Sequence, residues 1–164
     1  MKSARQLVDE ALAQVQTIDV AALRDRLLAL GRPAQNRVSR DMRLLDIREA
    51  DEVAAEGSIA GAVHVPRGLL EFRLDPASPW FDASLTTGVQ EWVLYCGVGW
   101  RSALAAKALQ EMGLQGVSHL GGGFQAWLAA GGAVQRVAPA AAERIPDAER
   151  AAPAPGTEGG AGVG

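Results

Sequence analysis

The chain has 164 residues, of which 48% are hydrophobic and 21% are charged, as expected for one globular domain with appendages. A net charge of -3 gives no electrostatic basis for binding nucleic acid or an anionic membrane surface. Two histidines and one cysteine exclude a zinc cluster and an internal disulfide, and no cofactor is indicated. The sequence shows neither a run of about 18 apolar residues nor the apolar core of a signal peptide, so we expect a cytoplasmic protein.

Two helices are predicted at the N-terminus. The first spans residues 3–16, where Ser3 and Gln6 match a capping box ahead of an apolar stripe. The stripe consists of Leu7, Ala11, Leu12 and Val15. The second helix has Asp19 as its N-cap and Gly31 as its stop signal. Its apolar face consists of Val20, Leu23, Leu27 and Leu30. The first helix either docks on the domain or binds a partner, and the size of its stripe favours docking.

Short strands and helices alternate along the rest of the chain. Strands are predicted at 43–47, 62–65, 92–95 and 117–120, helices at 49–55, 68–74, 102–112 and 124–130, and loops at 32–41 and 75–91. This alternation predicts an α/β fold with a parallel sheet. Residues 137–164 are rich in Ala, Pro and Gly and lack aromatic side chains, which predicts a flexible tail.

The only cysteine, Cys96, follows the strand at 92–95 and begins a loop that leads into the helix at 102–112. Inward-pointing N–H groups, the helix dipole and the charge of Arg101 favour a thiolate at this place. Gly97 and Gly99 allow the loop to turn sharply and a ligand to approach its backbone. A lone cysteine is often a buried structural residue. The surroundings of Cys96, at the strand end where parallel sheets bind ligands, favour a nucleophilic sulfur instead.

Four segments, in order, resemble motifs of the rhodanese family of sulfurtransferases. They are residues 45–49, 57–66, 96–102 and 120–127. Ser58 occupies the place of the family's usual histidine, a change that we interpret as structural. The resemblance implies a three-layer rhodanese-like α/β domain over residues 17–136, with a small central parallel sheet and flanking helices. Residues 1–16 would then form an N-terminal helical extension and 137–164 the tail.

The resemblance also implies a double displacement at Cys96. Thiosulfate, or a similar small anionic donor, would give its outer sulfur to the thiolate, and the resulting persulfide would pass it to cyanide, a thiol or a protein. The N–H groups of the loop would cradle the persulfide anion. The residues expected to bind the substrate are Gly97, Val98, Gly99, Trp100, Arg101, Ser102 and Arg67. Asp46 and Arg48 are expected to support the site structurally.

Several of these side chains have two possible roles. Arg101 is expected to pair with a carboxylate, either Asp46 or Glu71. Ser102 is either the N-cap of the following helix or a hydrogen-bond donor to the sulfur. Trp100 either forms a wall of the substrate entrance, which we favour, or packs beneath the loop.

Other candidate residues have a structural alternative. Arg48 and Arg67 each follow a predicted strand end, where an arginine can reach an anionic donor; a salt bridge is favoured for Arg48, and for Arg67 the alternatives are balanced. His64 and His119 lie in apolar strand-like runs and are interpreted as structural. The glycines at 121–123 lack the rest of a phosphate-binding pattern and are interpreted as a turn.

A phosphatase or arsenate reductase is the first alternative function. Tyrosine phosphatases place five residues between their cysteine and arginine, whereas four residues separate Cys96 from Arg101. A shorter loop forms a smaller ring of N–H groups, which suits a sulfur atom better than a phosphoryl group. No acidic residue near the loop is an obvious general acid.

Two further alternatives are a docking module and a sulfur relay. A docking module would need neither Cys96 nor Arg101, and the chain has both. A relay that receives sulfur from another protein uses the same persulfide as a thiosulfate sulfurtransferase. In either case the sulfur acceptor must come from outside the chain, because there is no second cysteine.

Overall fold

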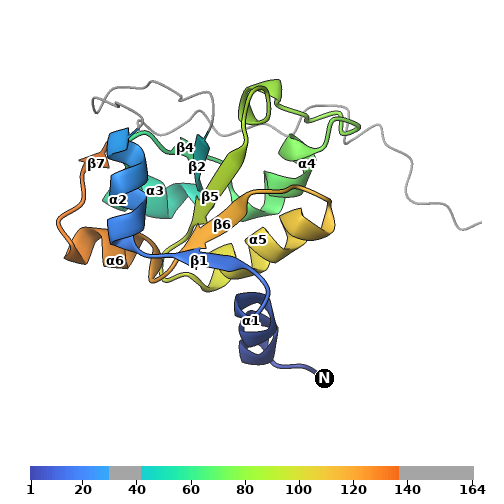
Figure 1. Cartoon of the computed structure of the whole chain (residues 1–164), viewed down its shortest axis with the longest axis horizontal. Coiled ribbons are helices and arrows are strands. Elements are labelled where there is room, and N and C mark those ends of the chain that lie inside the picture. The colour runs from blue at the N-terminus through green and yellow to red at the C-terminus, as the bar shows by residue number, and fades with distance from the viewer. Residues whose placement is uncertain (30–41, 137–164) are drawn as a thin grey trace, which may run out of the picture.

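The computed structural model describes residues 1–29 and 42–136, in which helices alternate with short strands (Figure 1). In chain order the elements are α1 (Ala4–Leu12), β1 (Gln16–Ile18), α2 (Val20–Ala29), β2 (Met42–Asp46), α3 (Ala50–Glu56), β3 (Ser58–Ile59), β4 (Val63–His64), η1 (Arg67–Leu69), α4 (Leu70–Leu74), η2 (Ala83–Leu85), β5 (Glu91–Tyr95), α5 (Trp100–Glu111), β6 (Val117–Leu120), α6 (Gly123–Ala129) and β7 (Val134–Gln135).

The centre of the fold is a five-stranded sheet with the strand order β1-β6-β5-β2-β4, in which every neighbouring pair is parallel. The four residues from Trp92 to Tyr95 in β5 are all buried, as expected for a strand whose two faces are both covered. β3 and β7 form a separate antiparallel pair. The predicted α/β fold with a small parallel sheet is confirmed.

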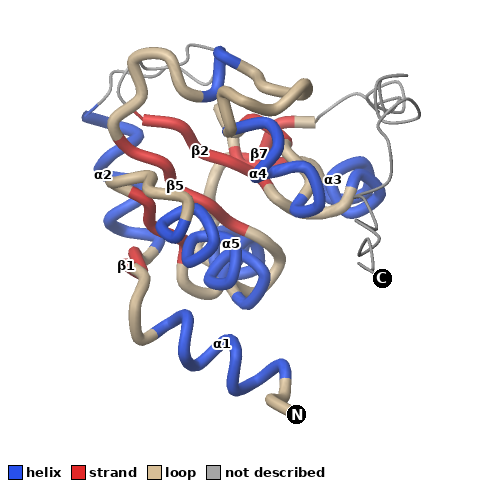
Figure 2. Tube along the Cα trace, turned by 90° about the vertical axis from the view of Figure 1, so that its right-hand side faces the viewer, coloured by secondary structure: helices blue, strands red, loops and turns tan. Residues whose placement is uncertain are grey.

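Helices cover both faces of the sheet and complete three layers (Figures 1 and 2). One core cluster joins α1, α4 and α5 to one face, and it contains Leu94, Cys96 and Leu109 among its buried members. The second cluster joins α2 and α6 to the opposite face around Tyr95 and Phe124. Because side chains alternate between faces along a strand, Cys96 points toward α5, and Tyr95 points away from it.

The N-terminal segment differs from the prediction. The capping box of Ser3 and Gln6 is present, but α1 ends at Leu12, and residues 16–18 form the edge strand β1 beside β6. The helical periodicity continued to residue 15 in the sequence, and a three-residue strand has too little pattern to compete with it. α1 lies against α5, which is the docked alternative, at the lower edge of the molecule (Figure 2).

Smaller differences concern element ends. β3, β7 and η2 were not predicted, and α5 begins at Trp100 rather than at residue 102. Asp19 does cap α2, since its carboxylate accepts the N–H of Ala22 at 2.8 Å. Leu30, the stop signal Gly31, the loop 32–41 and the tail 137–164 lie outside the described residues. Among the helices of residues 1–29 and 42–136, none has the length and apolar content needed to cross a bilayer.

Candidate active site

Cys96 lies at the junction between β5 and α5, and only 1% of its surface is exposed. Its Sγ accepts a hydrogen bond from the backbone N–H of Gly99 at 3.2 Å. The hydroxyl of Ser102, in the first turn of α5, lies 3.6 Å from the same sulfur. The sulfur therefore sits at the positive end of a helix dipole with an N–H donor and a hydroxyl beside it, an arrangement that stabilises an anion.

The turn into α5 is made by Gly99, which has a φ of 101° and is the N-cap of the helix. A side chain is strained at this φ, which explains the glycine. Ser102 is therefore not the N-cap, and that alternative of the prediction is wrong. The Ser102 hydroxyl instead donates to the carbonyl oxygen of Gly99 at 3.2 Å and lies 3.6 Å from the sulfur.

Helix α6 supports the cysteine loop, residues 96–102, from the other side. The N–H of Phe124 donates to Cys96 O at 2.8 Å, and the N–H of Gln125 donates to Gly97 O at 3.0 Å. Gly123 has a φ of 59°, and a Cβ on it would lie 2.7 Å from Gly97 O and closer still to Cys96 O. Gly123, the first residue of α6, thus lets the N-terminus of this helix approach the loop backbone, which requires more than the predicted turn.

The carboxylate partner of Arg101 is Glu52 in α3, and both predicted partners, Asp46 and Glu71, are wrong. The two terminal nitrogens of Arg101 donate to the two oxygens of Glu52, each at 2.7 Å. These hydrogen bonds lower the pKa of Glu52 to about 2, against the opposing effect of burial. They also raise the pKa of Arg101. Arg101 is therefore held as one half of a two-point ion pair beside the loop.

Asp46 and Arg48 lie on the far side of the sheet from the sulfur, within a buried polar cluster. The guanidinium of Arg48 donates to both oxygens of Asp46, at 3.0 and 2.8 Å, and both side chains are fully buried. Asp46 also accepts the hydroxyls of Ser58 at 2.9 Å and Tyr95 at 2.7 Å. Burial and the nearby charge of Asp46 raise the pKa of Tyr95 well above its usual value. Because Tyr95 precedes Cys96, this cluster anchors the end of β5.

Of the remaining predicted site residues, Gly97 and Arg67 are half-buried, and Val98 and Trp100 are exposed. Arg67 pairs with Glu71 at 2.7 Å, and its backbone N–H donates to Ile47 O beyond the C-terminal end of β2. Val98 is 60% exposed and Trp100 is 49% exposed. The guanidinium of Arg5 in α1 lies 5.6 Å from the centre of the Trp100 ring. Trp100 is thus a surface side chain bordered by α1 rather than a support packed beneath the loop.

His119 contributes a contact that the sequence did not indicate. Its Nδ1 lies 3.2 Å from the Ser102 hydroxyl, and its Nε2 lies 2.8 Å from the hydroxyl of Thr17 in β1. Burial lowers the pKa of the His119 imidazole. Both nitrogens are satisfied, as expected of a structural histidine, but one partner touches the sulfur. His64 instead bonds Arg48 O through Nε2 at 2.8 Å.

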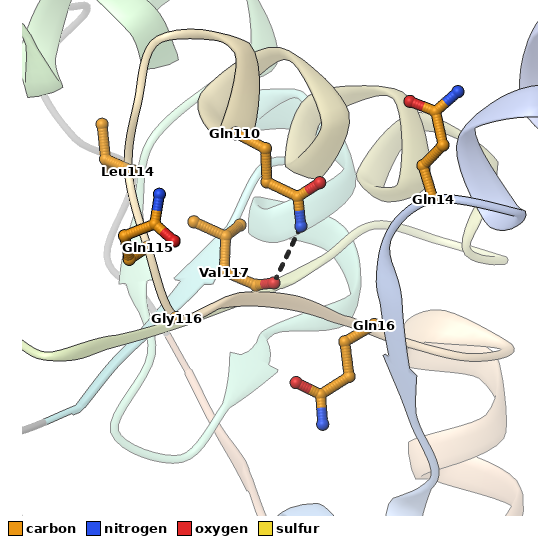
Figure 3. A pocket seen from close by; sticks show the side chains of 7 residues that line it. All are labelled: Gln14, Gln16, Gln110, Leu114, Gln115, Gly116 and Val117. Carbon is orange, nitrogen blue, oxygen red and sulfur yellow. Dashed lines mark hydrogen bonds between the residues drawn. The ribbon is translucent and has the colours of Figure 1, made fainter.

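A separate hollow of about 410 Å³ lies at the opposite end of the sheet, beside the start of β6 (Figure 3). It is lined by Gln14, Gln16, Gln110, Leu114, Gln115, Gly116 and Val117. None of these side chains is titratable or nucleophilic, so the hollow offers no group for covalent chemistry. In the part of the chain that the structure describes, no three His, Cys, Asp or Glu side chains gather as a metal site requires.

Sequence reasoning missed Glu52 and undervalued His119, for different reasons. The order of parallel strands contains the signal for His119, because β6 lies beside β5 and the ends of both strands meet at one edge of the sheet. No comparable signal exists for Glu52. Its approach to Arg101 depends on how α3 packs after β2, and several other acidic side chains fit the same requirement in the sequence.

Comparisons with known proteins indicate one protein family. A family model described as the rhodanese-like domain matches residues 32–130. No curated protein matches the chain. Among solved structures, a protein of unknown function from Rhodopseudomonas palustris, described as a possible tyrosine phosphatase, is 36% identical. That similarity covers 82% of this chain and 96% of the other, with a TM-score of 0.71.

Two sulfurtransferases are also similar in structure. The human single-domain sulfurtransferase TSTD1 is 30% identical over 70% of this chain and 96% of its own, with a TM-score of 0.54. A thiosulfate sulfurtransferase from Pseudomonas aeruginosa is 29% identical, with a TM-score of 0.56. The latter similarity covers 74% of this chain and 19% of that longer protein.

Proposed function

The chain belongs to the rhodanese-like domain family, and on that premise we propose that it is a sulfurtransferase that carries a sulfane sulfur on Cys96. The observation that carries the proposal is the position of Sγ, 3.2 Å from the Gly99 N–H at the N-terminus of α5. Such a place stabilises a thiolate before transfer and a persulfide anion after it. Two sulfurtransferases among the similar structures support the same chemistry.

In the first half-reaction the Cys96 thiolate attacks the outer sulfur of thiosulfate or a similar anionic donor. A new S–S bond forms, the donor's S–S bond breaks, and its electron pair leaves on sulfite. In the second half-reaction an acceptor nucleophile takes the outer sulfur and returns Cys96 as the thiolate. The acceptor, a thiol, cyanide or another protein, comes from outside because the chain has no second cysteine.

The surroundings of the sulfur favour a small donor. Cys96 is almost fully buried, whereas Val98 and Trp100 of the same loop are exposed. A nucleophile placed this deep is reached more readily by a compact anion than by a bulky substrate. The guanidinium groups of Arg101 and Arg67 are paired with Glu52 and Glu71, and Arg67 remains a candidate for binding the donor in competition with Glu71.

A protein phosphatase is the second candidate, because the similar protein from Rhodopseudomonas palustris is described as a possible tyrosine phosphatase. Two observations weigh against it. The loop places four residues between Cys96 and Arg101, and both terminal nitrogens of Arg101 are engaged by Glu52. Glu52 is the acidic residue nearest this arginine, but its lowered pKa keeps it ionised at neutral pH, so it is a poor proton donor to a leaving group.

The deciding experiment is the intact mass of the protein after mixing with excess thiosulfate and removing it. We expect wild type to gain one sulfur atom and Cys96→Ser to gain none. No gain in wild type would contradict thiosulfate as the donor, and a gain from a persulfidated donor protein would then indicate the sulfur relay. Hydrolysis of an aryl phosphate by wild type, lost in Cys96→Ser, would establish the phosphatase instead.

A further inference from the structure

A line of hydrogen-bonding groups runs from the buried sulfur to the edge of the sheet. Cys96 Sγ lies 3.6 Å from Ser102 Oγ, and Ser102 Oγ lies 3.2 Å from His119 Nδ1. His119 Nε2 lies 2.8 Å from Thr17 Oγ1. Cys96, Ser102 and His119 are each at most 1% exposed, whereas Thr17 is an exposed residue of the edge strand β1. The line therefore connects a buried thiol with solvent.

The Ser102 hydroxyl also reaches the carbonyl oxygen of Gly99 at 3.2 Å, and once it turns from that oxygen to the relay, two proton arrangements fit these four groups. With a neutral thiol, S–H donates to Ser102 Oγ, the Ser102 hydroxyl donates to Nδ1, and Nε2–H donates to Thr17. With a thiolate, each of these hydrogen bonds has the opposite direction. Thr17 donates to Nε2, Nδ1–H donates to Ser102, and Ser102 donates to the sulfur. The second arrangement requires a neutral imidazole that can change tautomer. The burial that lowers the pKa of His119 favours this neutral form.

We propose that His119 is a positioning residue that acts through Ser102 to hold Cys96 as a thiolate and to carry its proton to the surface at Thr17. The inference rests on the proposed function only in treating Cys96 as the nucleophile, and it holds for any sulfur donor. It also separates the two histidines, since His64 bonds a backbone carbonyl of Arg48.

The proton transfer balances without an added redox partner. The S–H bond of Cys96 breaks and its proton goes to Ser102 Oγ, while the original Ser102 proton goes to Nδ1 of His119. The imidazole gives its Nε2 proton to Thr17 Oγ1, and the original Thr17 proton goes to water. One proton has then left the protein, and the sulfur holds the negative charge.

Other charged groups also lie around this region. Arg101 interacts with the charge of Cys96 from α5, while Glu52 and Glu49 interact with Arg101 from α3. Arg5 and Asp9 pair with one another on α1, where Arg5 lies beside Trp100. The Asp46–Arg48 pair lies across the sheet. These groups are unchanged by substitutions in the relay, so a change in the thiolate profile after such a substitution reports on the relay.

The test is the pH dependence of the thiolate, followed by its ultraviolet absorbance and by alkylation with iodoacetamide. Cys96 is the only cysteine, so both signals belong to it. We expect His119→Asn to move the midpoint of the profile upward by about one pH unit. At a pH below the midpoint, this shift lowers the thiolate fraction about tenfold. Ser102→Ala should produce a similar shift. The double variant should shift no further than Ser102→Ala, because His119 acts through that hydroxyl.

His64→Asn is the matched control and should leave the profile unchanged. Thr17→Val should give a smaller shift than His119→Asn, since only the donor to Nε2 is lost. If His119→Asn does not fold by circular dichroism, His119→Gln takes its place. An unchanged midpoint in the folded variant, or additive shifts in the double variant, would overturn the proposal. Because the titration needs no donor, a protein that shows the shift but takes no sulfur from thiosulfate would count against the thiosulfate proposal alone.

Discussion

Glu52 holds Arg101 through two hydrogen bonds of 2.7 Å across a sequence separation of 49 residues. The same carboxylate accepts the N–H of Glu49 at the start of α3, at 2.9 Å. One side chain thus joins the beginning of α3 to the cysteine loop. The arginine of the loop is thereby kept in one orientation next to the sulfur, with its charge balanced.

Glu52→Gln should loosen this contact and cost about 0.5–1 kcal/mol of unfolding free energy, because both partners are about one-third exposed. The rate of sulfur transfer should fall by more than this loss of stability explains, because the loop loses its fixed arginine. Urea unfolding and the rate of thiocyanate formation measure the two effects. The control is Glu111→Gln, which removes the ion pair between Glu111 and Lys107 at the far end of α5. Equal rates for the two variants would contradict a role for Glu52 in the loop.

The same pair predicts a pH dependence of stability. The pKa of Glu52 is lowered from its ordinary value of 4.5 to about 2 in the folded protein, so ionised Glu52 favours folding. The stability difference between wild type and Glu52→Gln should be complete above pH 4.5 and should disappear as the pH falls toward 2. Urea unfolding at several pH values measures this difference. A difference that stays constant down to pH 2 would show that the ion pair is not its source.

Gly123→Ala should displace the cysteine loop. Gly123 has a φ of 59°, and a Cβ there would overlap the carbonyl oxygens of Cys96 and Gly97. Gly131 has a similar φ of 69°, but a Cβ on it would meet nothing within 4 Å. Gly131→Ala should therefore cost only the left-handed strain of about 1–2 kcal/mol. Gly123→Ala should cost more and slow alkylation of Cys96, and equal unfolding free energies for the two variants would rule out the overlap.

The strand, loop and helix around Cys96 could be predicted from the sequence because their signals are local. A continuous apolar run, two glycines and an Ala/Leu-rich stretch follow one another within about twenty residues, and each has one favoured conformation. The same kind of signal predicted the capping box of α1 and Asp19 as the cap of α2.

The partners of these residues could not be predicted, because they depend on packing. Arg101 had several acidic candidates, and the choice of Glu52 follows from the path of α3. His119 reaches Ser102 only because β6 lies beside β5. On α1, the stripe included Leu7 and Leu12, which face solvent, whereas Val8 is buried. A short helix permits several rotations about its axis, and its contact with α5 selects one of them.

Arg48→Met should cost about 3–5 kcal/mol of stability, because it leaves the fully buried charge of Asp46 without its partner. Urea unfolding measures the loss. The double variant Asp46→Asn, Arg48→Met should recover part of it, since the amide can still bond the hydroxyls of Ser58 and Tyr95. A folded Arg48→Met protein with unchanged stability and a raised KM for thiosulfate would instead make Arg48 a donor-binding residue.

Two neighbouring apolar side chains of the docked helix α1 differ in their exposure. Val8 is 2% exposed and faces the domain, whereas Leu7 is 43% exposed. Truncation of a buried side chain loses its transfer free energy and leaves a cavity, so Val8→Ala should cost about 1–3 kcal/mol. Leu7→Ala removes a larger side chain and should still cost less. Both variants keep the helix-forming character of α1. A greater loss for Leu7→Ala in urea unfolding would mean that α1 turns its other face to α5, and Trp100 would then lose its contact with Arg5.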